Sequence, residues 1–87
     1  MNFEYNINKS IINKAKHGID FEEAKVLFDD KDLLVIPLKF EDEKRYACIG
    51  KLNNKMWTAI ITFRNENVRI ISVRRSHKDE EKLYESN

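Results

Sequence analysis

Strand-forming segments in the second half of the chain constrain the fold most. Three β-prone segments follow one another, 45–52, 56–63 and 68–75, and the short stretches NNK and NEN separate them. Asparagine suits such tight turns because it tolerates left-handed backbone angles. Successive side chains of a strand point to opposite faces. We therefore expect a meander of antiparallel strands in which Trp57, Ala59, Ile61 and Phe63 share one face.

An earlier apolar segment, 33–40, is expected to add a fourth strand. Pro37 lies in its middle, and proline cannot donate a hydrogen bond to a neighbouring strand. The segment is therefore expected at an edge of the sheet or at a bend.

The first half of the chain has the pattern of helices. Asn8 is placed to cap a helix whose apolar residues Ile11, Ile12 and Ala15 follow helical spacing, and Gly18 is a natural stop. A second helix is expected to begin at Asp20, in a capping-box arrangement with Glu23. Its buried stripe is formed by Phe21, Ala24, Leu27 and Phe28.

The C-terminal segment is expected to form a last helix. Ser76 followed by Asp79 is a capping signature, and the helix should run through Tyr84. The fold class is thus α+β: an antiparallel sheet of about four strands, two N-terminal helices and one C-terminal helix, with the helices packed on one face.

Length and composition indicate one domain over residues 1–87. Hydrophobic residues make up 41% and charged residues 36%, and no apolar run approaches the ~20 residues of a membrane span. The N-terminus lacks the apolar centre of a signal peptide. Cys48 is the only cysteine and is expected in the core. A cytoplasmic location without membrane contact is the expectation.

The net charge of +1 conceals a segregation of charge. From Arg64 to Lys78 there are five basic residues and one acid, whereas 20–32 contains six acids and two lysines. A nearly neutral protein can still present a basic face to phosphate. An ordinary mixed surface is the competing interpretation.

The paired arginines at the end of the last strand cannot form one simple clamp. Alternation puts Arg74 on the face of Val68 and Arg75 on the opposite face. Arg64 ends the preceding strand, about 20 Å from Arg74 at ~3.4 Å per residue. Arg64 and Arg74 could therefore line one groove, but they could not grip the same phosphate.

Other polar residues form two further groups. His77, Glu80 and Tyr84 share one face of the last helix and could act in proton transfer, or simply face solvent. Lys16 and His17 close the first helix, where the helix dipole alone favours positive charge. No spacing typical of a metal site occurs, and with only Gly18 and Gly50 there is no phosphate-binding glycine loop. No cofactor is expected.

The sequence resembles the BrnT family, the ribonuclease toxins of BrnT–BrnA type II toxin–antitoxin modules. The resemblance rests on KHGIDFEEA, FDD, EKRYACIG, TFR, RIISVRR and the segment from Glu80 to Tyr84. The sequence departs from the family's usual residues at Tyr5, Val73 and Ser76, and at Lys31, where the family usually has proline. None of these departures removes a charged candidate residue.

The resemblance implies a RelE/ParE-like fold and cleavage of an RNA substrate that stops translation. It also implies a BrnA-like antitoxin as partner. The toxin–antitoxin complex would repress its own operon, and it would contact operator DNA only through the antitoxin. The matched polar positions are Lys16, His17, Arg64, Arg74, Arg75, Glu80 and Tyr84.

Metal-independent cleavage by the RNA's own 2′-hydroxyl needs a base, an acid and fixed positive charge. The hypothesis assigns phosphate stabilisation to Arg64 and to Arg74 or Arg75. Acid–base roles fall to Glu80, His17 or Tyr84, and substrate binding to Lys16, Arg69 and Lys78. The rival interpretation is a non-catalytic module that binds nucleic acid or an antitoxin, and segregated charge supports it equally well.

Overall fold

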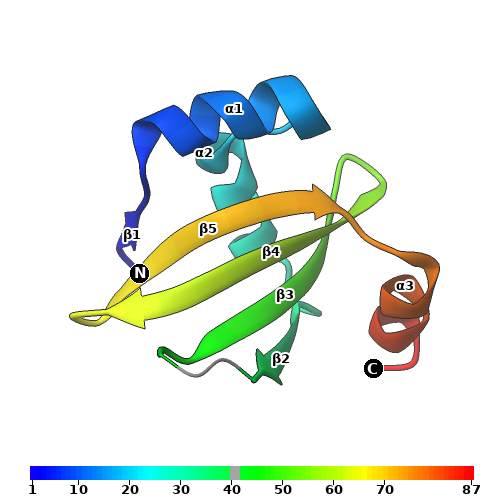
Figure 1. Ribbon diagram of the computed structural model, residues 1–87. Coiled ribbons are helices and arrows are strands. Elements are labelled where there is room, and N and C mark those ends of the chain that lie inside the picture. The colour runs from blue at the N-terminus through cyan, green and yellow to red at the C-terminus, as the bar shows by residue number, and fades with distance from the viewer. Residues whose placement is uncertain (40–41) are drawn as a thin grey trace.

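The computed structural model describes residues 1–39 and 42–87, which form an α+β fold around one mixed sheet (Figure 1). The sheet has five strands in the order β1-β5-β4-β3-β2. The elements in chain order are β1 (Phe3–Glu4), α1 (Ile7–His17), α2 (Phe21–Ala24), the 3-10 helix η1 (Lys25–Asp29), β2 (Leu34–Leu38), β3 (Arg45–Leu52), β4 (Lys55–Arg64), β5 (Asn67–Arg75) and α3 (Lys78–Glu85).

The expected antiparallel meander is confirmed for β2 to β5. Asn53 and Asn54 in the first turn and Asn65 and Glu66 in the second have positive φ angles, which is the conformation that tight hairpin turns require. The strand with Pro37 is confirmed at the sheet edge. Of the expected strand 33–40, Phe40 lies outside the described residues.

A fifth strand, β1, was not expected from the sequence. It pairs in parallel with β5, Phe3 with Val68 and Glu4 with Arg69. Two residues are too few to show a period of two, so nothing in the sequence distinguishes β1 from a loop. Because β1 is so short, it leaves most of the outer edge of β5 without a strand partner.

The core lies between the sheet and the N-terminal helices. Phe21, Ala24 and Leu27 of the second helical segment are buried, as expected, and belong to one core cluster with Cys48 and Ala59 of the sheet. Phe28, which was also expected to be buried, is only partly buried. Burial of Cys48 raises the pKa of its thiol to about 12, which is typical of an unreactive core cysteine.

One member of the expected buried face, Phe63, is 54% exposed. It packs on Tyr46, with ring centroids 5.4 Å apart, near the end of β4. The face itself is as expected, since Trp57, Ala59 and Ile61 are buried. An irregularity between Ile60 and Ile61 leaves Ile71 of β5 without a paired residue, so the alternation of β4 is unbroken while that of β5 is shifted after Ile70.

The apolar residues of α1 do not face the core, although their spacing is helical. Ile11 and Ile12 are 63% and 62% exposed, whereas Ser10 and Asn13 are buried. The Asn13 amide donates to the carbonyls of Ile19 and Val73 and accepts from the Val73 N–H. The helix thus turns a polar face to the protein, because the unpaired edge of β5 needs hydrogen-bond partners.

Two expected helix starts also differ. The cap of α1 is Asn6 rather than Asn8, since the Asn6 side chain accepts from the Lys9 N–H at 3.0 Å. The cap of α3 is His77 rather than Ser76 with Asp79, and its N–H donates to Glu80 at 2.8 Å. The capping box of Asp20 and Glu23 is confirmed, as is Gly18 as the end of α1, at φ 81°.

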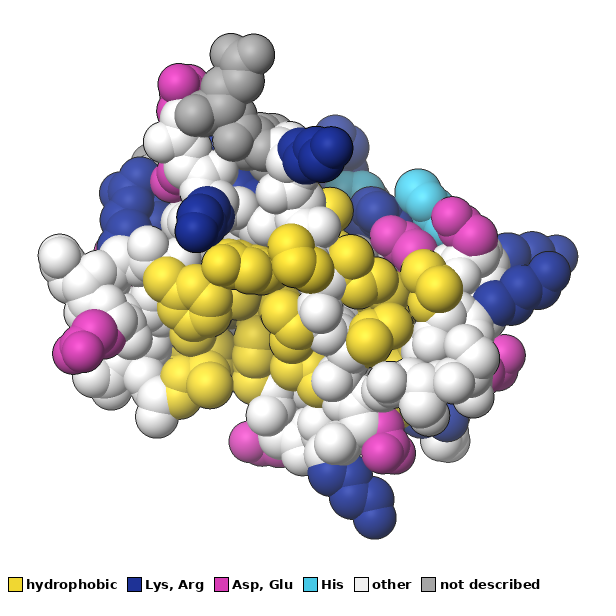
Figure 2. Space-filling model, turned by 90° about the horizontal axis from the view of Figure 1, so that it is seen from below, with side chains coloured by type: hydrophobic (Ala, Val, Ile, Leu, Met, Phe, Trp, Pro, Cys, Tyr) yellow, Lys and Arg dark blue, Asp and Glu magenta, His cyan; other side chains and the backbone are white. Residues whose placement is uncertain are grey.

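α3 lies against the other face of the sheet, so the helices do not all cover one face. Thr58 points away from the core face of its neighbour Ala59 and binds Glu80 of α3 at 3.1 Å. On the side of the molecule where Figure 1 places β2, Figure 2 shows hydrophobic side chains gathered in a broad band. No helix in the described part of the chain is long and apolar enough to cross a membrane.

Candidate functional site at the end of β5

Arg74 is locked to the first turn of α3. Its Nη1 and Nη2 donate to the two carboxylate oxygens of Glu80 at 2.7 and 2.9 Å, a two-pronged geometry that only arginine offers. The Thr58 hydroxyl donates to the same carboxylate and is hydrogen bonded to Ser76 at 2.8 Å. The bond from Arg74 is the main reason that the pKa of Glu80 falls to about 2.

Arg75 emerges on the face opposite to Arg74, as predicted. The expected sides are exchanged, because Ile71 has no paired residue in β4 and this bulge puts Arg75, not Arg74, on the face of Val68. The Arg75 guanidinium lies over the Trp57 ring, 5.5 Å from the centroid, and its Nε donates to the Met56 carbonyl at 3.2 Å. The residue is exposed. Among the described residues no carboxylate oxygen lies within 4.0 Å of its guanidinium, so its charge remains available to an anion.

The last turn of α1 lies at the same end of the molecule. The bonds of Asn13 to Val73 tie α1 to β5, and Figure 1 shows the two elements running in the same direction. Lys16 and His17 follow Asn13 by about one turn, as Arg75 follows Val73 by two residues. The fold therefore brings His17 toward the end of β5, with Lys16 exposed beside it.

His77 and Lys78 continue from Arg75 into α3. His77 is exposed, and its Nδ1 lies 3.8 Å from Glu80 Oε1. Sequence spacing groups His77 with Glu80 and Tyr84, but it does not reveal that both histidines of the chain lie at one end of β5. That proximity depends on the tertiary contact between α1 and β5.

Of the other expected site residues, Arg64 and Arg69 lie away from this end, whereas Tyr84 lines a pocket together with Arg75. Tyr84 donates to Asp30 at 2.7 Å, and this bond raises the pKa of its phenol to about 12. Arg69 pairs with Glu4 at 3.1 Å. Arg64 is 54% exposed and lies 4.0 Å from Glu43. Arg74 pairs with Thr58, which lies six residues before Arg64 in β4. Arg64 is therefore about 20 Å from Arg74 along the strand.

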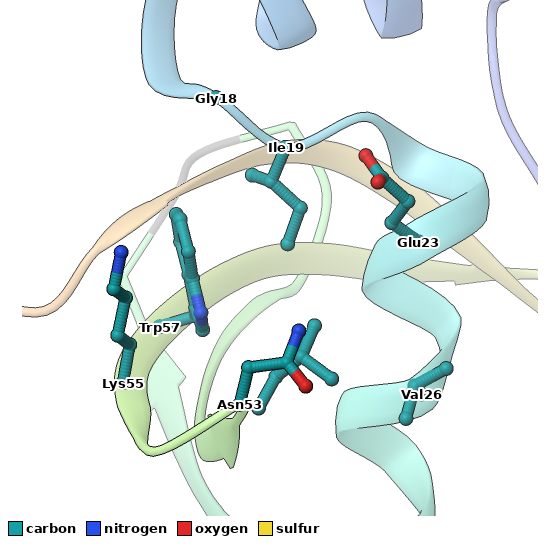
Figure 3. A pocket seen from close by; sticks show the side chains of 8 residues that line it. Gly18, Ile19, Glu23, Val26, Asn53, Lys55 and Trp57 are labelled. Carbon is teal, nitrogen blue, oxygen red and sulfur yellow. The ribbon is translucent and has the colours of Figure 1, made fainter.

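A hollow of about 380 Å³ adjoins Trp57 (Figure 3). Its walls come from the start of the second helical segment, the β3–β4 hairpin and Trp57. The sequence gives little signal for it, because hairpin and helix are distant in the chain. The one clue is the placement of Lys55 and the only tryptophan two residues apart, which puts them on the same face of β4.

No group of three or more His, Cys, Asp or Glu side chains within residues 1–39 and 42–87 is arranged to hold a metal ion. The polar groups at the end of β5 include guanidinium, imidazole and ammonium groups beside the Glu80 carboxylate. They can bind an anion and move protons.

The end of β5 in this small α+β protein combines two histidines and exposed lysines with an arginine that has no carboxylate partner in the described part of the chain, a set of groups suited to binding an anion. The family model described as "Ribonuclease toxin, BrnT, of type II toxin-antitoxin system" matches residues 5–80. The chain therefore belongs to the BrnT family of ribonuclease toxins, as its resemblance indicates. No curated protein gives a significant match.

Proposed function

We propose that this toxin cleaves RNA without a metal ion, by attack of a 2′-hydroxyl on the adjacent phosphorus. The bond between phosphorus and the 5′-oxygen of the following nucleotide breaks. This leaves a 2′,3′-cyclic phosphate on one product and a 5′-hydroxyl on the other. One group accepts the proton of the attacking hydroxyl and another donates a proton to the leaving oxygen. Cleaved RNA would stop translation and so account for toxicity.

The contrast between Arg74 and Arg75 carries this proposal. Arg74 is held by Glu80 and serves to position the junction of β5 and α3. Arg75 has no carboxylate partner among the described residues and is oriented by Trp57 and the Met56 carbonyl. An oriented, permanently charged guanidinium is suited to stabilise the negative charge that develops on phosphate oxygens.

His17 and His77 are the groups to which we assign proton transfer. A carboxyl with a pKa of about 2, such as Glu80, holds a proton weakly and makes a poor base at neutral pH. The Tyr84 phenol is already donating to Asp30. Imidazole titrates near neutral pH in general and can serve as either acid or base, and two histidines supply both roles.

Lys16 and Lys78 are assigned to the RNA backbone near the cleaved phosphate, because both are exposed near the end of β5. Arg64 lies too far away to share that phosphate. Its exposed guanidinium could contact only another part of a strand that runs along the molecule. Arg69, paired with Glu4, is at most a minor contact.

A type II toxin has an antitoxin partner, and we propose a BrnA-like protein for this role. Ile7, Ile11 and Ile12 of α1 are 70%, 63% and 62% exposed, and large apolar side chains gathered on a surface are typical of sites for a protein partner. The complex would repress its own operon through the antitoxin's DNA-binding domain. The toxin would encounter both its RNA substrate and its antitoxin in the cytoplasm.

The test is cleavage of end-labelled RNA by the purified protein in EDTA, beside Arg75→Ala and Arg64→Ala. Loss of one charge-stabilising donor typically costs about a hundredfold in rate. We expect Arg75→Ala to show that loss and Arg64→Ala to keep most of the activity. Equal activity in Arg75→Ala would remove Arg75 from the site. RNA binding without cleavage by the wild type would favour the non-catalytic module.

A further inference from the structure

We infer that the hollow beside Trp57 binds a nucleobase of the RNA. This inference rests on the proposed ribonuclease function and assigns it a base-recognition subsite. Three observations carry it: a buried hydrogen-bond donor without a partner, the size and composition of the hollow, and the arginine on the same tryptophan.

The first observation is the indole N–H of Trp57. Trp57 is 8% exposed, and its Nε1 is buried without a hydrogen-bond partner in the described structure. Buried polar groups of native proteins are nearly always paired, and an unpaired one costs stability. Figure 3 shows the ring as one wall of the hollow, with its nitrogen at the end toward Asn53 and away from Gly18. An acceptor on a bound molecule would satisfy this donor once a neighbouring side chain moves aside, because the nitrogen is closed off from solvent in this structure.

The second observation is the make-up of the hollow. Ile19, Leu52 and the Trp57 ring give it apolar walls, while Glu23, Asn53 and Lys55 supply a few polar groups. Small-molecule sites have this composition, and a volume of about 380 Å³ is near the lower end of their usual range. A flat heterocycle with donors and acceptors along its edges, such as a single base, is the ligand of matching size and chemistry.

The polar groups differ in what they offer to a base. Glu23 is an acceptor, and its hydrogen bond from Lys14 lowers the pKa of its carboxyl, so it is ionised at neutral pH. Lys55 is a donor, whereas the Asn53 amide offers both functions. Because bases differ in the donors and acceptors of their edges, such a set discriminates between them.

The third observation connects the hollow to the proposed cleavage site. Arg75 lies over the Trp57 ring but does not line the hollow. Trp57 therefore contacts Arg75, the residue proposed to bind phosphate, and at the same time forms a wall of the proposed base subsite. A nucleotide whose phosphate meets Arg75 could place a neighbouring base against Trp57.

Trp57 also provides the measurement, because it is the only tryptophan of the chain. The probes are short 2′-O-methyl RNA oligonucleotides, which lack the attacking hydroxyl, and an abasic oligonucleotide of the same length. We expect saturable changes in Trp57 fluorescence with base-containing probes, and at least tenfold weaker binding of the abasic probe. Binding should also differ at least tenfold between the best and the worst of the four bases.

Two variants test the hollow itself. Glu23→Gln removes the charge but keeps the capping box of α2, where glutamine serves as well. Val26→Phe adds bulk at the rim, where Val26 is 48% exposed. Each should weaken base-dependent binding about tenfold or more. The matched controls are Glu22→Gln, in the same helix turn but outside the lining, and Val35→Phe, at a valine that is 49% exposed; both should bind as the wild type.

The two proposals fail in different ways. If abasic and base-containing probes bind equally, and Arg75→Ala weakens both, the base subsite is wrong while the phosphate site stands. If the two hollow variants bind like their controls, the base subsite is wrong as well. If no probe binds, the proposed RNA site fails and the base subsite with it. Thermal unfolding of each variant separates loss of binding from loss of folding.

Discussion

Arg74 and Glu80 are joined by two hydrogen bonds, Nη1 to Oε1 at 2.7 Å and Nη2 to Oε2 at 2.9 Å. The pair connects the end of β5 to the first turn of α3. Glu80 also accepts from the His77 N–H, so the same carboxylate closes the start of the helix. The placement of His77, one of the proposed proton-transfer groups, therefore depends on a neighbour that does not itself need to touch RNA.

Acid should weaken this junction. The folded-state pKa of Glu80, about 2, is below the ordinary value of 4.5. Its contribution to stability is therefore complete above pH 4.5 and is lost as the pH falls toward 2. We expect Glu80→Gln to lower the free energy of unfolding by about 2 kcal/mol at neutral pH, a figure reduced for the partial exposure of the pair.

Urea unfolding at neutral pH and near pH 3 measures this effect. The difference in unfolding free energy between wild type and Glu80→Gln should shrink at the lower pH. Asp79→Asn, an exposed neighbour in the same helix turn, controls for loss of a negative charge near the helix start. A difference that is the same at both pH values would show that ionisation of Glu80 is not what stabilises the junction.

The two histidines should each be needed for cleavage. Removal of a general acid or base typically costs 10²- to 10⁴-fold in rate, and we expect this of His17→Asn and His77→Asn under single-turnover conditions. The pH profile of the rate should also change, with a different limb flattened in each variant. Full activity in both variants would reject the proton-transfer assignment, and full activity in one would leave only the other in that role.

The sheet could be predicted well from sequence because its signals are local. The turns at Asn53–Asn54 and at 65–66, and the edge position of Pro37, each follow from the residues at that place. The opposite orientation of Arg74 and Arg75 follows from the period of a strand, but the face of each was predicted wrongly, because the bulge at Ile71 shifts the alternation. Which of them is paired could not be predicted, because Glu80 becomes the partner of Arg74 only when α3 folds against the second face.

The buried face of α1 does not follow its apolar residues, because a hydrogen-bonding requirement takes precedence. Apolar spacing in Ile11 and Ile12 would normally mark the buried side. Here β1 covers only the first part of β5, so buried backbone groups near Val73 need a polar partner, which Asn13 supplies. The hollow beside Trp57 was missed for a related reason, since its walls meet only in three dimensions.

The bond between Tyr84 and Asp30 should hold the C-terminal half of α3 in place. Its presence raises the phenol pKa from 10.0 to about 12, so its contribution is complete below pH 10 and is lost as the pH rises through 12. In Tyr84→Phe we expect backbone amides of α3 to exchange with solvent several-fold faster at neutral pH, while those of β4 do not change. Hydrogen exchange followed by mass spectrometry reports both.

Tyr46→Phe is the matched control for that measurement, because Tyr46 contributes to the sheet through ring packing on Phe63. It should leave exchange in α3 as in the wild type. Unchanged exchange of α3 in Tyr84→Phe would mean that the Arg74–Glu80 pair alone is enough to hold the helix.

Asn13 should be the most sensitive polar residue for stability. It is 7% exposed and makes three hydrogen bonds to backbone groups of Ile19 and Val73. Asn13→Ala leaves these groups unpaired, and we expect a loss of about 2–3 kcal/mol in the free energy of unfolding. Asn13→Asp should lose more, since a buried carboxylate cannot donate to the two carbonyls and would face them with negative charge.

Urea unfolding of these variants beside Asn8→Ala gives the comparison. Asn8 lies in the same helix but is exposed, so its replacement should change the unfolding free energy by less than about 0.5 kcal/mol. If Asn13→Ala is as stable as Asn8→Ala, the edge of β5 must find other partners, such as water. The attachment of α1, and with it the approach of His17 to the end of β5, would then rest on other contacts.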